Sequence, residues 1–156
     1  MTILEKILQT KRLEVKQLLM EERVVSCETM PKRSSLFEIL RESDRLEVIS
    51  EMKRASPSKG MIAGNTDPVT QAKAYEQAGA ACISVLTDTT FFKGSFDDLA
   101  AVAEAVAIPL LCKDFIIHEV QIGRAKQAGA SVILLIVAAL DDATLQRLHR
   151  YATGLG

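Results

Sequence analysis

Two opposite charges stand at the carboxyl end of a short apolar segment in the first third of the chain. The segment 46–60 reads LEVISEMKRASPSKG, and its apolar start gives way to Glu51 and Lys53 before a loop rich in Ser, Pro and Gly. Because residues alternate sides along a strand, Glu51 and Lys53 are expected to share one face. Parallel α/β folds place their chemistry at such strand ends, whereas the structural alternative is an ion pair that merely closes the strand.

Polar residues also follow the next two apolar runs. Thr87 and Asp88 come directly after CISVL at 82–86, and Lys113 and Asp114 end the run PLLCKD at 109–114. If these runs are parallel strands, their carboxyl ends meet at one edge of a sheet. We therefore expect Lys113 to converge with Glu51 and Lys53 on a shared cavity. The neighbours of Lys113 have the opposite parity, so Cys112 should face the covering helices and Asp114 should brace the following loop.

The composition limits the class of protein. The chain has 156 residues, is 48% hydrophobic and 25% charged, and carries a net charge of -1, as expected for one soluble globular domain. Near-neutral charge argues against nucleic acid or an anionic membrane as the main partner. The three cysteines, Cys27, Cys82 and Cys112, form no CxxC pair, which favours reduced thiols and a cytoplasmic protein without a zinc site. The charged N-terminus argues against a signal peptide or membrane span.

Short apolar runs alternate with amphipathic segments along most of the chain. Helical spacing predicts an amphipathic helix over 1–22, and Ser35 is expected to cap a short helix over 36–41. The sequence QAGA occurs at 77–80 and again at 127–130, each time before a fully apolar run typical of a parallel strand. The predicted strands cover 46–53, 81–87, 109–115 and 131–138, and the predicted helices that follow them cover 68–78, 96–106, 118–128 and 141–152.

Four successive βα units fit either a small doubly wound sheet or half of a (β/α)8 barrel. Chemistry at three strand ends and the lack of a GxGxxG or GxxxxGK[ST] motif favour the barrel. A whole barrel takes about 250 residues. We therefore expect an α/β chain with an N-terminal helical extension over 1–45 and the first half of a (β/α)8 TIM barrel over 46–156, truncated before a fifth strand.

Five segments together resemble the indole-3-glycerol-phosphate synthase family. In order along the chain they are ISEMKRASPSKG at 49–60, ISVLTD at 83–88, FKGSFDDL at 92–99, PLLCKDF at 109–115 and GASVILLIVAAL at 129–140. The resemblance implies ring closure and decarboxylation of a phosphorylated, open-chain aminodeoxyribulose that carries a carboxyphenyl group. It also implies that the reaction uses no metal or organic cofactor.

The resemblance assigns roles to three charged residues. Lys113 matches the general acid, which a carbonyl under attack by a weak aromatic nucleophile requires. Lys53 matches the second lysine, which binds anionic groups of the substrate, and Glu51 matches the carboxylate that orients both lysines.

The resemblance also assigns the substrate-binding positions. Ser56 matches a serine that contacts the substrate, although a purely structural turn role before Pro57 is as compatible with its surroundings. Phe92, Phe115 and Leu134 match positions that line the pocket for the aromatic ring, with ordinary core packing as the alternative.

The family's general-base glutamate, its asparagine and its phosphate-binding loops belong to later strands that this chain does not contain. We therefore expect the chain alone to have little synthase activity, and its parent to be a monomeric enzyme for a small phosphorylated substrate. One alternative is a non-enzymatic half-barrel that dimerises or aggregates through exposed strand edges. A related barrel, the phosphoribosylanthranilate isomerase, is disfavoured by the pair Lys53 and Lys113 with the SPSKG loop.

Overall fold

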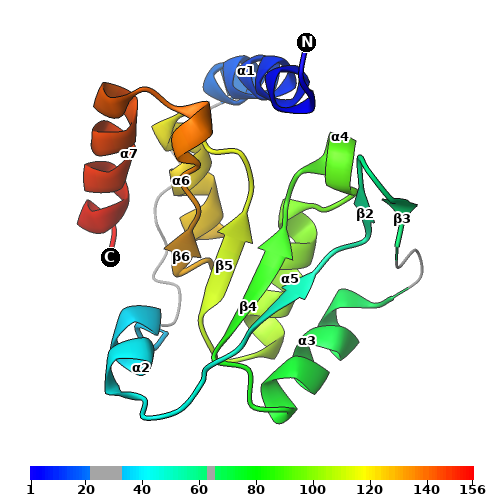
Figure 1. Cartoon of the computed structure of the whole chain (residues 1–156), viewed down its shortest axis with the longest axis vertical. Coiled ribbons are helices and arrows are strands. Elements are labelled where there is room, and N and C mark those ends of the chain that lie inside the picture. Colours follow the sequence, from blue (N-terminus) through cyan, green and yellow to red (C-terminus); the bar gives the residue numbers. More distant parts are fainter. Residues whose placement is uncertain (22–32, 63–65) are drawn as a thin grey trace.

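Four parallel strands form the central sheet of this protein in the computed structural model, which describes residues 1–21, 33–62 and 66–156. Each strand pairs in parallel with its neighbour in the order β1-β4-β5-β6 (Figure 1). Parallel neighbours require crossover connections, and helices supply them. The strands are β1 (Ile49–Met52), β4 (Cys82–Leu86), β5 (Leu110–Lys113) and β6 (Val132–Ile133).

The helices confirm the predicted alternation of strands and helices. The first helix of the chain lies across the carboxyl ends of the strands, and the last two pack against each other (Figure 1). The helices are α1 (Ile3–Glu21), α2 (Leu36–Glu42), α3 (Pro68–Gln77), α4 (Thr89–Phe92), α5 (Phe96–Ala105), α6 (Glu119–Gln127) and α7 (Asp142–Gly154), with a short 3-10 helix at Val137–Ala139.

Side-chain caps begin several of these helices, as predicted for Ser35, and glycine turns follow two of them. Ser35 accepts a hydrogen bond from the Glu38 amide at the start of α2, and Asp67 and Asp141 cap α3 and α7 in the same way. In the turns after α3 and α6, Gly79 and Gly129 have φ of 87° and 91°. This left-handed conformation suits glycine, so the two QAGA copies have the same structural purpose.

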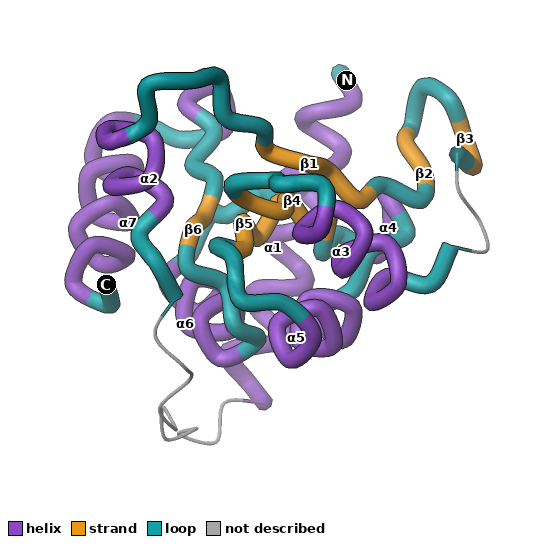
Figure 2. The backbone as a smooth tube through the Cα atoms, turned by 90° about the horizontal axis from the view of Figure 1, so that it is seen from below, coloured by secondary structure: helices purple, strands orange, loops and turns teal. Residues whose placement is uncertain are grey.

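The core lies between the sheet and the helices on one of its faces (Figure 2). Cys112 is buried there, as its parity predicted, together with Ile83 from β4 and Leu99 from α5. On β5, Lys113 therefore projects to the opposite face of the sheet. One face is thus a packed core, and the other is free to carry polar chemistry.

Some predicted elements differ from the structure. The strand predicted over 131–138 pairs with β5 only at Val132–Ile133, and the chain then turns into the 3-10 helix. The predicted loop after β1 contains a small antiparallel hairpin of β2 (Ala55–Ser56) and β3 (Gly60–Met61). The short helix α4 was also not predicted.

Two further observations concern the cysteines and membranes. Cys82 and Cys112 are buried free thiols, whereas Cys27 lies outside the described residues. Among the residues that the structure describes, no helix combines the length and apolarity needed to cross a membrane.

Candidate active site

Glu51 joins the two predicted lysines at the carboxyl end of the sheet. Its Oε1 lies 2.7 Å from Lys53 Nζ, and its Oε2 lies 2.9 Å from Lys113 Nζ. Ser84, from the same face of β4, donates a weaker hydrogen bond of 3.3 Å to Oε2. Side chains from strands that are distant in sequence thus meet around one carboxylate.

These three side chains remain accessible. Glu51 is 30% exposed, and the Lys53 and Lys113 side chains are each 34% exposed. Burial alone raises the pKa of Glu51, but hydrogen bonds and charge interactions with Lys53 and Lys113 outweigh it, so its pKa lies below the ordinary value. Glu51 is therefore a carboxylate at neutral pH, and it holds two ammonium groups where a substrate can reach them.

Two predicted ring-binding residues also come together. Phe92 ends α4, Phe115 follows β5, and their ring centroids lie 6.1 Å apart with a 32° angle between the planes. This spacing is within the favourable range for an aromatic pair. Both rings are half-buried, so they form an apolar surface near the strand that carries Lys113.

Leu134 lies one residue beyond the paired part of β6. Its neighbours Ile133 and Leu135 both pack toward the cluster of Ile116 and Leu148 on the helical side. Since side chains alternate in extended chain, Leu134 is directed to the same face as Lys113. Ile133 pairs with Cys112, which places Leu134 in line with Lys113 along the sheet.

Ser56 is engaged in its own hairpin. Its Oγ accepts a hydrogen bond of 3.2 Å from the Lys59 amide and lies 3.4 Å from the Ser58 hydroxyl. This is the turn role considered as the alternative for Ser56. The hairpin nevertheless packs against α4, so Ser56 lies close to the helix that carries Phe92.

The conformation of the chain after α4 accounts for several residues of the motif FKGSFDDL at 92–99. Lys93 has φ of 58°, and a Cβ on Gly94 would lie 2.0 Å from the Leu86 carbonyl oxygen. Only glycine fits where the chain passes so close to the end of β4. Asp98, at the start of α5, then forms an ion pair with Arg54 and fixes the loop after β1.

A buried lysine that was not predicted lies beside the carboxyl ends of β4 and β5. Lys11 of α1 is 2% exposed, and its Nζ lies 2.9 Å from Asp88 and 2.8 Å from Asp114. Ile7 and Val15, one turn on either side, are also buried. A charged residue in the middle of a buried stripe was the signal available in the sequence.

Asp114 and its neighbours form a chain of buried hydrogen bonds. Asp114 accepts a bond of 2.7 Å from the Thr87 hydroxyl and one of 2.8 Å from the Phe115 amide, and it thereby braces the following loop, as expected. Cys112 Sγ lies 3.4 Å from the Thr87 hydroxyl. Burial raises the pKa of the Cys112 thiol to about 12, so this residue is a neutral member of the network.

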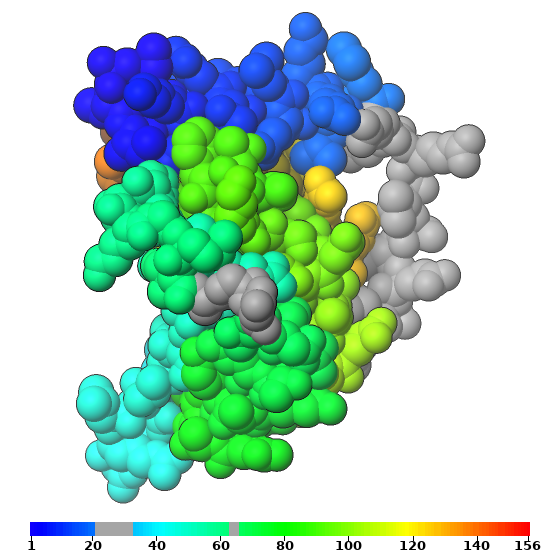
Figure 3. Space-filling model, turned by 90° about the vertical axis from the view of Figure 1, so that its right-hand side faces the viewer, coloured from blue at the N-terminus to red at the C-terminus, as the bar shows by residue number. Residues whose placement is uncertain are grey.

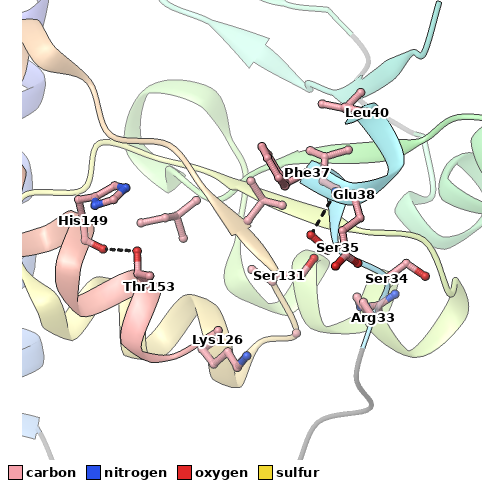
Figure 4. Close-up of a pocket in the computed structure, with 16 residues that line it drawn as sticks. Arg33, Ser34, Ser35, Phe37, Glu38, Leu40, Lys126, Ser131, His149 and Thr153 are labelled. Atoms are coloured by element: carbon pink, nitrogen blue, oxygen red, sulfur yellow. Dashed lines mark hydrogen bonds between the residues drawn. The ribbon is translucent and has the colours of Figure 1, made fainter. Parts of the chain in front are cut away.

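A large cavity lies away from these residues. It has a volume of about 1030 Å³ and separates α2 from β6 and α7, beside the amino end of β6 (Figure 4). The polar groups drawn there serve local structure: the Ser35 hydroxyl caps α2, and Thr153 donates to the His149 carbonyl within α7. His118, the other histidine, caps α6 through Nδ1, which accepts a hydrogen bond from the Val120 amide.

Comparison with known proteins identifies the family. The family model described as indole-3-glycerol phosphate synthase matches residues 4–156. The chain is 55% identical over its full length to the indole-3-glycerol phosphate synthase of Exiguobacterium sibiricum, and it covers 60% of that protein. It is 53% identical to the corresponding protein of Oceanobacillus iheyensis, also over its full length, and covers 59% of it.

The matches also show how much of each relative the chain covers. The chain spans about 60% of the length of these curated relatives. Among solved structures, the YdjI aldolase from Escherichia coli K12 aligns with 76% of this chain and 50% of its own, at 18% identity and a TM-score of 0.41, from which we infer nothing. The family match over residues 4–156 and the full-length identity lead to one conclusion: this chain belongs to the indole-3-glycerol phosphate synthase family.

Proposed function

We propose that this chain is the N-terminal portion of an indole-3-glycerol-phosphate synthase of tryptophan biosynthesis, a cytoplasmic carbon–carbon lyase. The observation that carries the proposal is the carboxylate of Glu51 between the amines of Lys53 and Lys113 in a chain of this family. The substrate is 1-(2-carboxyphenylamino)-1-deoxyribulose 5-phosphate. The products are indole-3-glycerol phosphate, CO2 and water.

In the proposed mechanism, Lys113 donates a proton to the ribulose carbonyl oxygen while the aromatic carbon attacks the carbonyl carbon. One carbon–carbon bond forms in this step. The bond to the carboxyl group then breaks as CO2, and its electrons restore the aromatic ring. The new hydroxyl group takes up a second proton and leaves as water while the adjacent methylene carbon loses a proton, and the double bond that forms completes the indole. Lys53 binds the anionic carboxylate of the substrate, and Glu51 holds both amines at the required separation.

The apolar side chains have a separate role in this proposal. Phe92, Phe115 and Leu134 contact the carboxyphenyl ring and direct its reactive carbon toward the carbonyl. Ser56 contacts the substrate from the hairpin beside α4. No step calls for a metal ion or an organic cofactor.

We propose that residues 1–45 are a helical extension and that residues 46–156 are the first half of a (β/α)8 barrel. The later strands of such a barrel supply the general base and the phosphate-binding loops. This chain alone should therefore show little turnover, and the whole enzyme should act as a monomer on a small phosphorylated substrate.

Turnover measurements test this function. The chain extended by about 100 residues to a complete barrel should convert the substrate, and the 156-residue chain should not. In the extended enzyme, Lys113→Met should lower kcat by about a thousandfold, as removal of a general acid does. Lys59→Met, in the exposed turn between β2 and β3, is the matched control. Equal rates for Lys113→Met and the parent would contradict the assignment.

One observation favours a second candidate, a half-barrel that associates with itself. Leu46 and Val48, just before the outer strand β1, and Ile49 at its start are 91%, 53% and 45% exposed. Exposed apolar side chains at an unpaired strand edge promote pairing with another chain. A dimer or aggregate of the 156-residue chain on size-exclusion chromatography would support this candidate, and a compact monomer would contradict it.

A further inference from the structure

Lys11 is the only described residue for which the structure gives ion pairs with both Asp88 and Asp114. Its Nζ also lies 2.8 Å from Glu14, so three carboxylates surround one ammonium group. Lys11, Asp88 and Asp114 are nearly inaccessible, at 2%, 1% and 5% exposure. Figure 3 shows α1 packed along the molecule above the green segment that follows β4.

Each of the two buried carboxylates holds the backbone of one residue of the aromatic pair, and Asp88 also holds that of Phe91. Asp88 Oδ1 accepts hydrogen bonds of 2.6 Å from the Phe91 amide and 3.1 Å from the Phe92 amide. Asp114 Oδ1 accepts a hydrogen bond of 2.8 Å from the Phe115 amide. The other oxygen of Asp88 faces Lys11. The ammonium group therefore lies between the two anchors of the aromatic pair.

From this arrangement we propose that Lys11 is a positioning residue, which sets the separation of Phe92 and Phe115 and thereby shapes the ring-binding surface. Without its charge, two buried carboxylates face each other with no cation between them, and they repel. The anchors then move apart, and the two rings follow because their amides are bonded to those carboxylates. The link to substrate binding rests on the proposed function.

The pKa of Lys11 agrees with its position among these carboxylates. Burial by itself lowers the pKa of Lys11, but Asp114, Glu14 and Asp88 more than compensate, so its pKa is raised. Lys11 therefore stays charged throughout the physiological range. The cation is a permanent part of the arrangement.

The direct test follows the rings. The chain contains five phenylalanines, and incorporation of 4-fluorophenylalanine gives each one a 19F resonance. Lys11→Met should shift the Phe92 and Phe115 resonances and leave that of Phe37 in α2 unchanged. Lys16→Met, an exposed lysine of the same helix, is the matched control and should shift none of them.

A second variant covers the case in which Lys11→Met does not fold. Lys11→Gln keeps a hydrogen-bond donor but removes the charge, and it should produce the same selective shifts. The proposal is overturned if Phe92 and Phe115 do not move. It is also overturned if all five resonances change together in both variants, because Lys11 then stabilises the whole fold and does not position the two rings in particular.

Kinetics of the extended enzyme test the consequence for substrate. Lys11→Met should lower kcat/KM by about a hundredfold, mainly through a higher KM, because the ring contacts already form in the bound ground state. Unchanged kcat/KM would overturn the link between Lys11 and substrate. If the unaltered extended enzyme has no turnover, the proposed function fails, and the 19F result still decides whether Lys11 positions the rings.

Discussion

The two ends of the sheet are each fastened by a cation from the N-terminal segment, but the partners of that cation differ. At the carboxyl end, Lys11 meets the full charges of Asp88 and Asp114 in a buried environment. At the amino end, Arg33 donates hydrogen bonds of 2.7 Å and 2.9 Å to the carbonyls of Val106 and Ile108, just after α5. At the carboxyl end the cation forms ion pairs with buried carboxylates. At the amino end the cation donates hydrogen bonds to backbone carbonyl groups.

The contacts described at the amino end are made to backbone groups. Arg33 also donates to the Ala103 carbonyl, while Glu76 accepts a hydrogen bond of 2.7 Å from the Ala107 amide. Together they satisfy the free backbone groups where α5 ends and β5 begins. Such bonds stabilise without isolating a charge from water. A buried charge cluster is a costly way to fasten a helix, and it occurs at the end where the ring-bearing residues must be placed.

The largest effect should come from breaking the carboxyl-end cluster. Asp114→Asn removes the buried charge that pairs with Lys11, and we expect it to lower the free energy of unfolding by about 3–5 kcal/mol. Urea unfolding followed by circular dichroism measures the loss. Asp97→Asn, an exposed aspartate in the first turn of α5, is the control and should change stability by less than about 0.5 kcal/mol.

A somewhat smaller effect should follow from crowding the same end of the sheet. Gly94→Ala places a Cβ against the Leu86 carbonyl, and we expect a loss of about 3 kcal/mol. Gly154→Ala in α7, where a Cβ meets nothing within 4 Å, should be neutral or slightly stabilising. Equal melting temperatures for the two variants would show that the close approach at Gly94 is not required.

Breaking the amino end should cost less and leave the site intact. Arg33→Ala removes charged hydrogen bonds to three carbonyls, and we expect a loss of about 2 kcal/mol. The 19F resonances of Phe92 and Phe115 should stay in place. Arg45→Ala, whose side chain is 76% exposed, should have almost no effect on stability. Movement of the two rings in Arg33→Ala would mean that the two ends are not independent.

The smallest effect should appear on acidification. The folded pKa of Glu51 is lowered, so its ion pairs contribute stability above the unfolded pKa of about 4.3, and that contribution is lost as the pH falls through the folded pKa. Stability measured between pH 5 and pH 2 should therefore fall less steeply in Glu51→Gln than in the unaltered chain. Identical slopes would show that Glu51 gains nothing from Lys53 and Lys113.

The sequence predicted most elements of the fold because their signals are local. Apolar runs predicted the strands, the cap Ser35 predicted the start of a helix, and the QAGA turn that contains Gly79 predicted the end of another. The lengths of the strands were harder to predict. The paired part of β6 is short, and a run of apolar residues does not by itself determine how many of its residues pair with a neighbouring strand. The helix α4 occupies only four residues, too few for a periodic pattern.

The site was predictable in part for a similar reason. Alternation along β1 and β5 placed Glu51 and Lys113 on one face, and their meeting followed from parallel pairing. Lys11 was missed because a lysine in an amphipathic helix is ordinarily solvated, and its burial depends on carboxylates far along the chain. Ile7, Lys11 and Val15 lie on one stripe of the helix, and this spacing indicates that Lys11 could be buried. The spacing does not identify the carboxylates that pair with Lys11.

The cluster around Lys11 also bears on how the molecule is made. Residue 11 is synthesised before residue 114, whose carboxylate is added only after three strands of the sheet, β1, β4 and β5, have been made. Until then the first helix carries an ammonium group in its apolar stripe, which opposes burial of that stripe. Docking of α1 should thus be among the last events during synthesis, so that the surface for the ring is completed only once the sheet beneath it exists.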